Sequence, residues 1–265
     1  MPKTGNHLGM SALISHPEKK PIEEQMQIFA SVGFDSFFLS CGVTDQFERI
    51  PFWSNCAKQI GIDFEAVHAP SDMVDAVWQG TEAATAYKKA TERIIDHCSA
   101  GEISKLVLHT GTDPSLFPTE CGLEFWHNLE NYAKQRAVSL CYENANTPML
   151  FEAVVASADS FHGVCHDIGH QLCYTPQLDY VNLFCDKIRY THIHDNLADG
   201  RDLHFLPKDG VCDWNGYFSR LRQTGYSGTL NLELSCYHNP MYRDLSFEQF
   251  AKIAYDRLRQ FNLQD

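Results

Sequence analysis

Short apolar runs alternate along the whole chain with longer amphipathic stretches. The short runs are bounded by turn-forming residues, a pattern that predicts β-strands. Eight predicted strands span residues 8–15, 34–40, 63–69, 105–111, 138–144, 161–167, 188–195 and 229–235. The amphipathic stretches between them predict helices, most clearly at residues 21–33, 82–101 and 246–261. The first of these helices begins at a proline, and the first two end at a glycine, as helices commonly do.

Eight strands, each followed by a helix, are typical of an α/β fold, the (β/α)8 TIM barrel, which spans about 250 residues. The alternative is a doubly wound open sheet. The chain contains neither G-x-G-x-x-G nor G-x-x-x-x-G-K-[ST], the usual nucleotide signatures of such sheets. No linker divides the sequence, so we expect residues 1–265 to form a single barrel domain.

Composition argues against a membrane or secreted protein. The longest uncharged apolar runs have only about six to eight residues, well short of the ~20 that a membrane span requires. The N-terminus lacks the basic-then-apolar order of a secretory signal. Ten cysteines are scattered through the predicted elements without a C-x-x-C motif, so we expect them to be reduced and the protein to be cytoplasmic.

The formal net charge of -13 bears on the choice of partner. Nucleic acid binding depends largely on lysine and arginine side chains that neutralise phosphates. We therefore expect a small-molecule partner, with neither nucleic acid nor membrane, and leave open whether the chain forms a homo-oligomer.

Ionisable side chains lie at or near the C-terminal ends of the third to eighth predicted strands. In a TIM barrel, that face carries the active site. The six side chains are restricted to histidine, aspartate and glutamate, which is the composition of a metal site: His68, His109, Glu143, Asp167, His192 and Glu233. Alternatively, His68 and His109 are rim histidines that only form hydrogen bonds.

Glu143 and Glu233 lie within strongly apolar strands, where an unpaired carboxylate is costly to bury and a divalent cation would compensate. Asp167 and His170 raise the same question at the end of another apolar run. His192 and His194 are two residues apart and so project to the same side of a strand. Either one is a ligand and the other lines the pocket, or His194 bonds to Asp195.

Residues 197–213 show no clear periodicity, which in a compact barrel indicates a functional loop. Asp202 and His204 lie two positions apart within it. They either complete a further metal site or form a solvated pair in the loop.

Seven motifs together resemble a known family. In order, they are HAP, LHTG, YENAN, HDIGH, HIHDN, DLHFLPKDGVCDW and ELS. Their order and approximate spacing resemble the xylose isomerase-like TIM barrel superfamily, which joins sugar phosphate isomerases and epimerases to the type IV AP endonucleases (AP endonuclease family 2). The resemblance covers nearly the whole chain.

The resemblance implies a core metal site made by four residues: Glu143, Asp167, His192 and Glu233. The endonuclease branch adds further ligands for a three-zinc cluster, and all of those residue types are present: His68, His109, His170, Asp202 and His204. The core alone would suit Mn²⁺, Mg²⁺ or Co²⁺, and the histidine-rich outer set Zn²⁺.

The preferred function is a metal-dependent isomerase or epimerase of a small sugar, sugar phosphate or related keto-polyol. Related epimerases transfer a proton through a metal-stabilised enediolate, which implies Glu143 and Glu233 as the proton-transfer pair and His170 as a group that orients the substrate. The alternatives are a zinc phosphodiesterase of the AP endonuclease type, a dehydratase of a cyclic keto acid, and a non-catalytic sugar-binding barrel. The negative charge and the missing basic patch argue against DNA as substrate.

Overall fold

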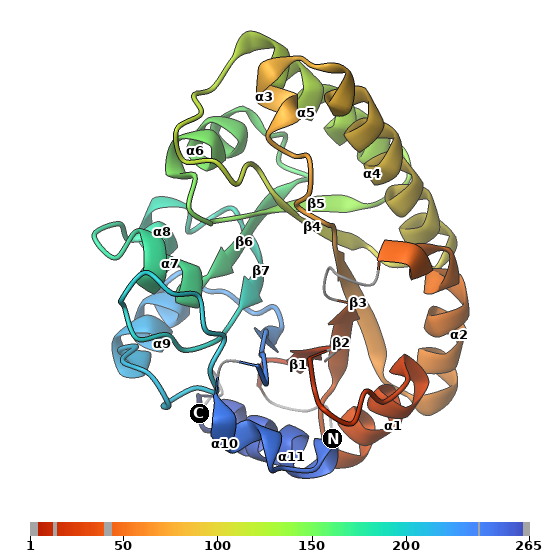
Figure 1. Ribbon diagram of the computed structural model, residues 1–265, viewed down its shortest axis with the longest axis vertical. Helices are drawn as coiled ribbons and strands as arrows, with labels where there is room; N and C mark the ends of the chain where they lie inside the picture. The colour runs from red at the N-terminus through yellow and green to blue at the C-terminus, as the bar shows by residue number, and fades with distance from the viewer. Residues whose placement is uncertain (1–4, 13–14, 40–43, 238, 262–265) are drawn as a thin grey trace.

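The computed structural model describes residues 5–12, 15–39, 44–237 and 239–261 (Figure 1). Eight parallel strands form one sheet: β1 (Leu8–Ser11), β2 (Ser36–Leu39), β3 (Asp63–His68), β4 (Lys105–His109), β5 (Ser139–Glu143), β6 (Gly163–Asp167), β7 (Ile188–His192) and β8 (Leu230–Leu232). Each predicted strand is found, although residues 13–14 and 40, at the ends of the first two, lie outside the described residues.

The sheet closes on itself, with strand order β7-β6-β5-β4-β3-β2-β1-β8. β1 pairs with β8 in parallel, with Leu8 opposite Leu230. At the other edge, Ile193 directly after β7 bridges to Leu232, and its N–H donates to the Asn231 carbonyl oxygen at 2.8 Å. The predicted (β/α)8 barrel is therefore confirmed, and a doubly wound open sheet is excluded.

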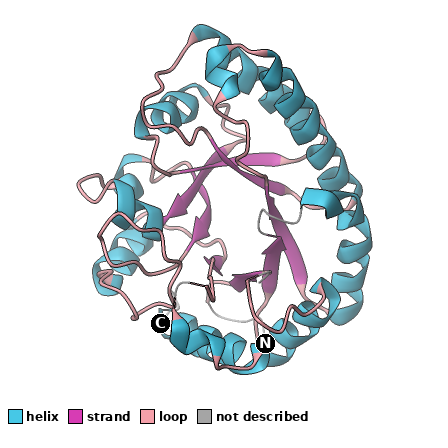
Figure 2. Ribbon diagram, in the orientation of Figure 1, coloured by secondary structure: helices cyan, strands magenta, loops and turns pink. Residues whose placement is uncertain are grey.

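Helices surround the barrel on the outside (Figure 2). They are α1 (Ile22–Val32), α2 (Ile50–Ile60), α3 (Ala76–Gln79), α4 (Glu82–Ala100), α5 (Glu120–Lys134), α6 (Pro148–Ser157), α7 (Ile168–Tyr174), α8 (Tyr180–Leu183), α9 (Trp214–Gln223), α10 (Pro240–Arg243) and α11 (Phe247–Leu258), with 3₁₀ helices η1 (Thr44–Arg49) and η2 (Arg259–Phe261). Within the described ranges, none of these helices combines the length and the apolar character needed to cross a membrane.

Local sequence explains several helix ends. α1 stops at Gly33, whose φ of 118° is readily adopted only by glycine. α11 begins with a capping box in which Ser246 and Gln249 satisfy each other's backbone N–H groups. These signals are local in sequence, which is why the predicted helix boundaries agree closely with the structure.

A small cluster of fully buried side chains fills the centre of the barrel: Phe38, Ala66, Val107, Cys141, Cys165 and Tyr190. Phe38 of β2 meets Tyr190 of β7 edge to face, with ring centroids 6.0 Å apart, so side chains from distant strands pack across the interior. Side chains two positions apart in a strand face the same side. The next inward position on β3 to β7 is therefore an ionisable residue, and this places the candidate site directly on an apolar floor.

Candidate metal centre at the C-terminal end of the barrel

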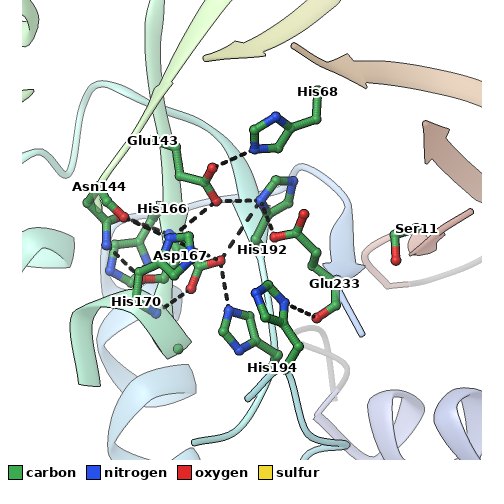
Figure 3. Close-up of polar contacts among 12 residues, drawn as sticks. Ser11, His68, Glu143, Asn144, His166, Asp167, His170, His192, His194 and Glu233 are labelled. Carbon is green, nitrogen blue, oxygen red and sulfur yellow. Dashed lines mark hydrogen bonds and ion pairs between the residues drawn. The ribbon is translucent and has the colours of Figure 1, made fainter. Parts of the chain in front are cut away.

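The four residues of the expected core site converge at one point. His192 Nδ1 lies 2.6 Å from Glu143 Oε1, 3.1 Å from Glu233 Oε2 and 3.9 Å from Asp167 Oδ2 (Figure 3). One potential ligand atom from each of the four lies within 4.8 Å of the others. All four side chains are buried, and Glu233, just after β8, keeps 7% of its surface exposed.

His68 and His109 extend this core on the side of β3 and β4. Their Nε2 atoms lie 2.8 and 2.9 Å from Glu143 Oε2. Glu143 is therefore within hydrogen-bond distance of three imidazoles, because His192 lies 2.6 Å from its other oxygen. The structure thus places both rim histidines against the core carboxylate.

The other predicted residues form a second cluster beside the core, centred on Asp202. His170 Nε2 and His204 Nε2 lie 3.1 and 2.9 Å from Asp202 Oδ2. The His194 ring stacks on the His204 ring with centroids 3.9 Å apart, and His194 Nε2 lies 3.0 Å from Asp167 Oδ2. We call His170, His194, Asp202 and His204 the outer cluster; its potential ligand atoms also lie within 4.8 Å of one another.

The orientation of three histidines fits metal ligation. His68, His170 and His204 each direct Nδ1 at a backbone carbonyl oxygen, at 2.8, 3.1 and 3.0 Å. When Nδ1–H donates to the carbonyl, Nε2 of the neutral ring carries a lone pair and is an acceptor. In each of the three histidines, Nε2 faces a carboxylate oxygen, which is also an acceptor. Two acceptors so close require a proton or a cation between them. A histidine that ligates a metal through one ring nitrogen commonly donates the N–H of its other ring nitrogen to a carbonyl oxygen in this way.

The surroundings of Glu143 keep its carboxylate ionised. Burial opposes ionisation of Glu143, but the imidazoles of His192 and His68 outweigh it and hold the pKa of Glu143 well below its usual value. Burial likewise disfavours a charged His204, yet Asp202 raises the pKa of His204 to about 9. The centre therefore consists of negative oxygens closely opposed to imidazoles, a donor set that suits a divalent cation.

Asp195 has a role that the sequence did not indicate. The alternative pairing of His194 with Asp195 is not what the structure shows, because Asp195 is directed into the following loop. Its carboxylate accepts hydrogen bonds from Trp214 Nε1 at 3.0 Å, Lys208 N at 2.9 Å and Cys212 N at 3.0 Å. Asp195 thus anchors the 197–213 loop, which carries Asp202 and His204 of the outer cluster.

Two asparagines were also missed. Asn144 accepts from the Asp167 N–H and donates to the Asp167 carbonyl oxygen, both at 2.8 Å. Asn196 donates to the Gly169 carbonyl oxygen at 2.9 Å and accepts from the Leu203 N–H at 2.5 Å. Both asparagines are buried. Their position directly after the YE and HIHD motifs was the one available signal, since a polar side chain at a buried strand end needs partners.

Comparison with known proteins agrees with this architecture. A family model described as xylose isomerase-like TIM barrel matches residues 26–255. An uncharacterised protein, y4fM of Sinorhizobium fredii (strain NBRC 101917 / NGR234), is 33% identical over 110 residues. That match covers 40% of this chain and 35% of the relative, so the chain aligns with about a third of the relative's length.

Solved structures show the same fold at low sequence identity. D-psicose 3-epimerase from Clostridium cellulolyticum H10, crystallised with D-tagatose, superimposes with a TM-score of 0.77 at 14% identity, covering 98% of this chain and 100% of its own. The IOLI protein with a bound zinc atom gives a TM-score of 0.74 at 15% identity, covering 96% of this chain and 97% of its own.

Proposed function

Because the chain belongs to the xylose isomerase-like TIM barrel family, we propose that it is a divalent-metal-dependent isomerase or epimerase of a small sugar, sugar phosphate or related keto-polyol. The observation that carries the proposal is the placement of two buried glutamates around one imidazole nitrogen. Glu143 ends β5 and Glu233 follows β8, and they approach His192 Nδ1 to 2.6 and 3.1 Å. The fold shared with sugar epimerases supports the same reaction class.

The core residues Glu143, Asp167, His192 and Glu233 would hold the cation. Three carboxylates and one imidazole form a hard donor set, which favours Mn²⁺, Mg²⁺ or Co²⁺. A cation held there would supply the positive charge that stabilises the negative charge developing on the substrate's oxygens when a proton is moved at the carbon next to its carbonyl group.

The two glutamates have different surroundings, which supports a different role for each. Both oxygens of Glu143 are held by histidines, two of them on Oε2, and the residue is fully buried. Among the described residues, the ion-pair partner of the Glu233 carboxylate is His192, and Glu233 keeps some exposure. Glu233 is therefore the freer base, and Glu143 exchanges a proton on the other side of the substrate.

His170 completes the proposed machinery as an orienting group. Its Nδ1 is fixed by the Asn144 carbonyl oxygen, so Nε2 points to one place beside Asp202. A ring fixed in this way presents Nε2 in a defined direction, where it accepts from a substrate hydroxyl when neutral or donates to a carbonyl when protonated.

Exchange of the substrate α-hydrogen with solvent deuterium tests the proposal, with a panel of ketoses and the cobalt-loaded protein. Glu143→Gln and Glu233→Gln should each abolish exchange while the fold persists, and exchange is compared on variant protein in which bound metal has been measured. Glu152→Gln, an exposed glutamate on α6, is the matched control and should exchange normally. Exchange at the wild-type rate in either site variant would make that glutamate a ligand only and contradict the two-base scheme.

A second candidate, a zinc phosphodiesterase of the AP endonuclease type, is supported by one observation. In the outer cluster, His170 and His204 each direct Nδ1 at a backbone carbonyl oxygen and Nε2 at Asp202, so the residues of this cluster could hold further cations. The discriminating measurement is zinc content per chain together with incision of an abasic-site duplex. Three zinc ions and an incision activity lost in Asp202→Asn would favour this candidate over the isomerase.

A further inference from the structure

The segments that surround the candidate metal centre carry little positive charge. Residues 69–81, 110–119 and 144–147, which follow β3, β4 and β5, contain no lysine or arginine. The first two contribute acidic residues instead, at Asp72, Asp75 and Asp113. A phosphate ester bound at a protein site is usually met by guanidinium or ammonium groups or by metal ions.

Four cations in the segments that follow β1, β7 and β8 have partners outside the centre. Arg201, next to Asp202 in the chain, pairs with Asp199 at 2.9 Å between Nε and Oδ2, and 65% of its side chain is exposed. Other side chains have their own partners: Lys20 with Glu24, Lys208 with Gln260 and Arg243 with the Tyr237 carbonyl oxygen.

Among the described residues, a group of basic side chains lies together at a different cavity. Lys19, Lys20 and Arg49 line a cavity of about 460 Å³ that shares no lining residue with the metal centre. Arg49 pairs there with Glu23 at 2.7 Å. These three basic side chains are therefore an alternative phosphate site, which an experiment must exclude.

The net charge of the centre with one core dication is also unfavourable for a phosphate group. Glu143, Asp167 and Glu233 of the core and Asp202 of the outer cluster would together offer four negative charges against the two positive charges of one dication held in the core. One dication leaves two negative charges uncompensated. Even if His170 and His204 were both protonated, their two positive charges would only neutralise these two, and both histidines already face Asp202. A singly loaded centre has no surplus positive charge for a phosphate dianion, whereas three dications would create one.

We infer that the substrate is an uncharged keto-sugar or keto-polyol and not a phosphate ester. This inference rests on the proposed isomerase function with one core cation. The recognition chemistry would be hydrogen bonding of hydroxyl groups to the three histidines and the Asp202 carboxylate of the outer cluster, which is compatible with a polar, net-neutral ligand.

The test pairs each ketose of a panel with its terminal phosphate ester, on protein whose metal content has been measured. Two readouts are needed: deuterium exchange at the α-carbon, and calorimetric binding of both forms and of inorganic phosphate to cobalt-loaded protein. We expect the free sugar to exchange, with the ester at least about tenfold weaker in both kcat/KM and binding. Asp202→Asn, which removes one negative charge, should reduce the difference in binding affinity between the free sugar and its phosphate ester.

Arg201→Gln and Arg49→Gln are the matched controls, and neither should change the preference. A singly loaded protein that prefers the ester at least tenfold overturns the inference and leaves the proposed function intact, and loss of that preference in either arginine variant identifies the phosphate site. If no ketose exchanges in either form, the proposed function fails and the inference fails with it.

Discussion

The indole Nε1 of Trp214 donates a hydrogen bond of 3.0 Å to Asp195 Oδ2, and this bond ties the first residue of α9 to the segment after β7. Backbone N–H groups of Lys208 and Cys212 bond to the same carboxylate. Asp195 is fully buried, so it acts as an internal anchor for the 197–213 loop. The loop in turn carries half of the outer cluster.

Asp195→Ala should destabilise the protein by about 2–4 kcal/mol, because it leaves several buried donors without an acceptor. Urea unfolding measures this change, and limited proteolysis should show cleavage within residues 197–213. Trp214→Phe removes one donor and keeps most of the packing, so it should cost only about 1 kcal/mol. Equal, small effects of both changes would mean that the carboxylate does not organise the loop.

Asn144 should control metal affinity without being a ligand. Its side chain forms two hydrogen bonds to the backbone of Asp167, which fix that ligand at the end of β6. Removal of a group that orients a metal ligand typically lowers metal affinity 10–100-fold. We expect Asn144→Ala to weaken Co²⁺ binding by about that factor, as measured by calorimetry.

Asn146→Ala is the control, since Asn146 lies two residues further and donates to the Thr112 carbonyl oxygen outside the centre. Its Co²⁺ affinity should remain that of the wild type. An unchanged affinity in Asn144→Ala would show that β6 alone is sufficient to position Asp167.

Metal should also stabilise the fold measurably. A ligand that binds only the native state at a hundred times its Kd contributes about 2.7 kcal/mol, which for a chain of this size raises Tm by about 5–10 °C. Differential scanning calorimetry with and without Mn²⁺ or Co²⁺ tests this. His192→Ala should abolish the shift, and Asp202→Asn should retain it if only the core is filled. No shift in the wild-type protein would contradict a tight core site.

Much of this centre could be predicted from sequence because strands have a two-residue period. On β5, for example, Cys141 lies in the apolar interior, so Glu143 must reach the same side one step nearer the rim. On β7, Tyr190 and His192 are related in the same way. Local alternation and the closure of the barrel together bring such residues to one place.

The loop contributions could not be predicted in the same way. His204 adopts a φ of 49°, an uncommon conformation for a non-glycine residue, and its Nδ1 is held by the Glu233 carbonyl oxygen from another part of the chain. A Cβ on Gly169 would lie 2.1 Å from the His194 ring, so that close packing depends on glycine. Such features depend on long-range geometry, which periodicity does not contain.

His162 is a buried histidine outside the metal centre, and its hydrogen bonds define its protonation state. The Leu140 N–H donates to His162 Nδ1 at 2.9 Å, while Nε2 lies 3.2 Å from the Glu130 carbonyl oxygen. Nδ1 must therefore be an acceptor, and a second proton there would oppose the Leu140 donor. Burial lowers the pKa of His162 to about 4, although the Glu130 carbonyl and Asp159 partly offset this and Lys134 adds to it.

This lowered pKa predicts a loss of stability in mild acid. Above about pH 6.5 His162 is neutral in both states; as pH falls towards 4, the unfolded chain binds a proton that the folded chain does not. The loss of stability should amount to about 2–3 kcal/mol by pH 4.5 and level off below pH 4. Urea unfolding at pH 7 and pH 4.5 measures this loss, with a chelator present so that metal binding does not contribute to stability.

His162→Gln should be less stable than the wild type at pH 7 but should lose less stability on acidification. His127→Gln, which changes an exposed histidine on α5, should behave as the wild type. An acid-induced loss of the same size in His162→Gln would assign the pH dependence to other groups.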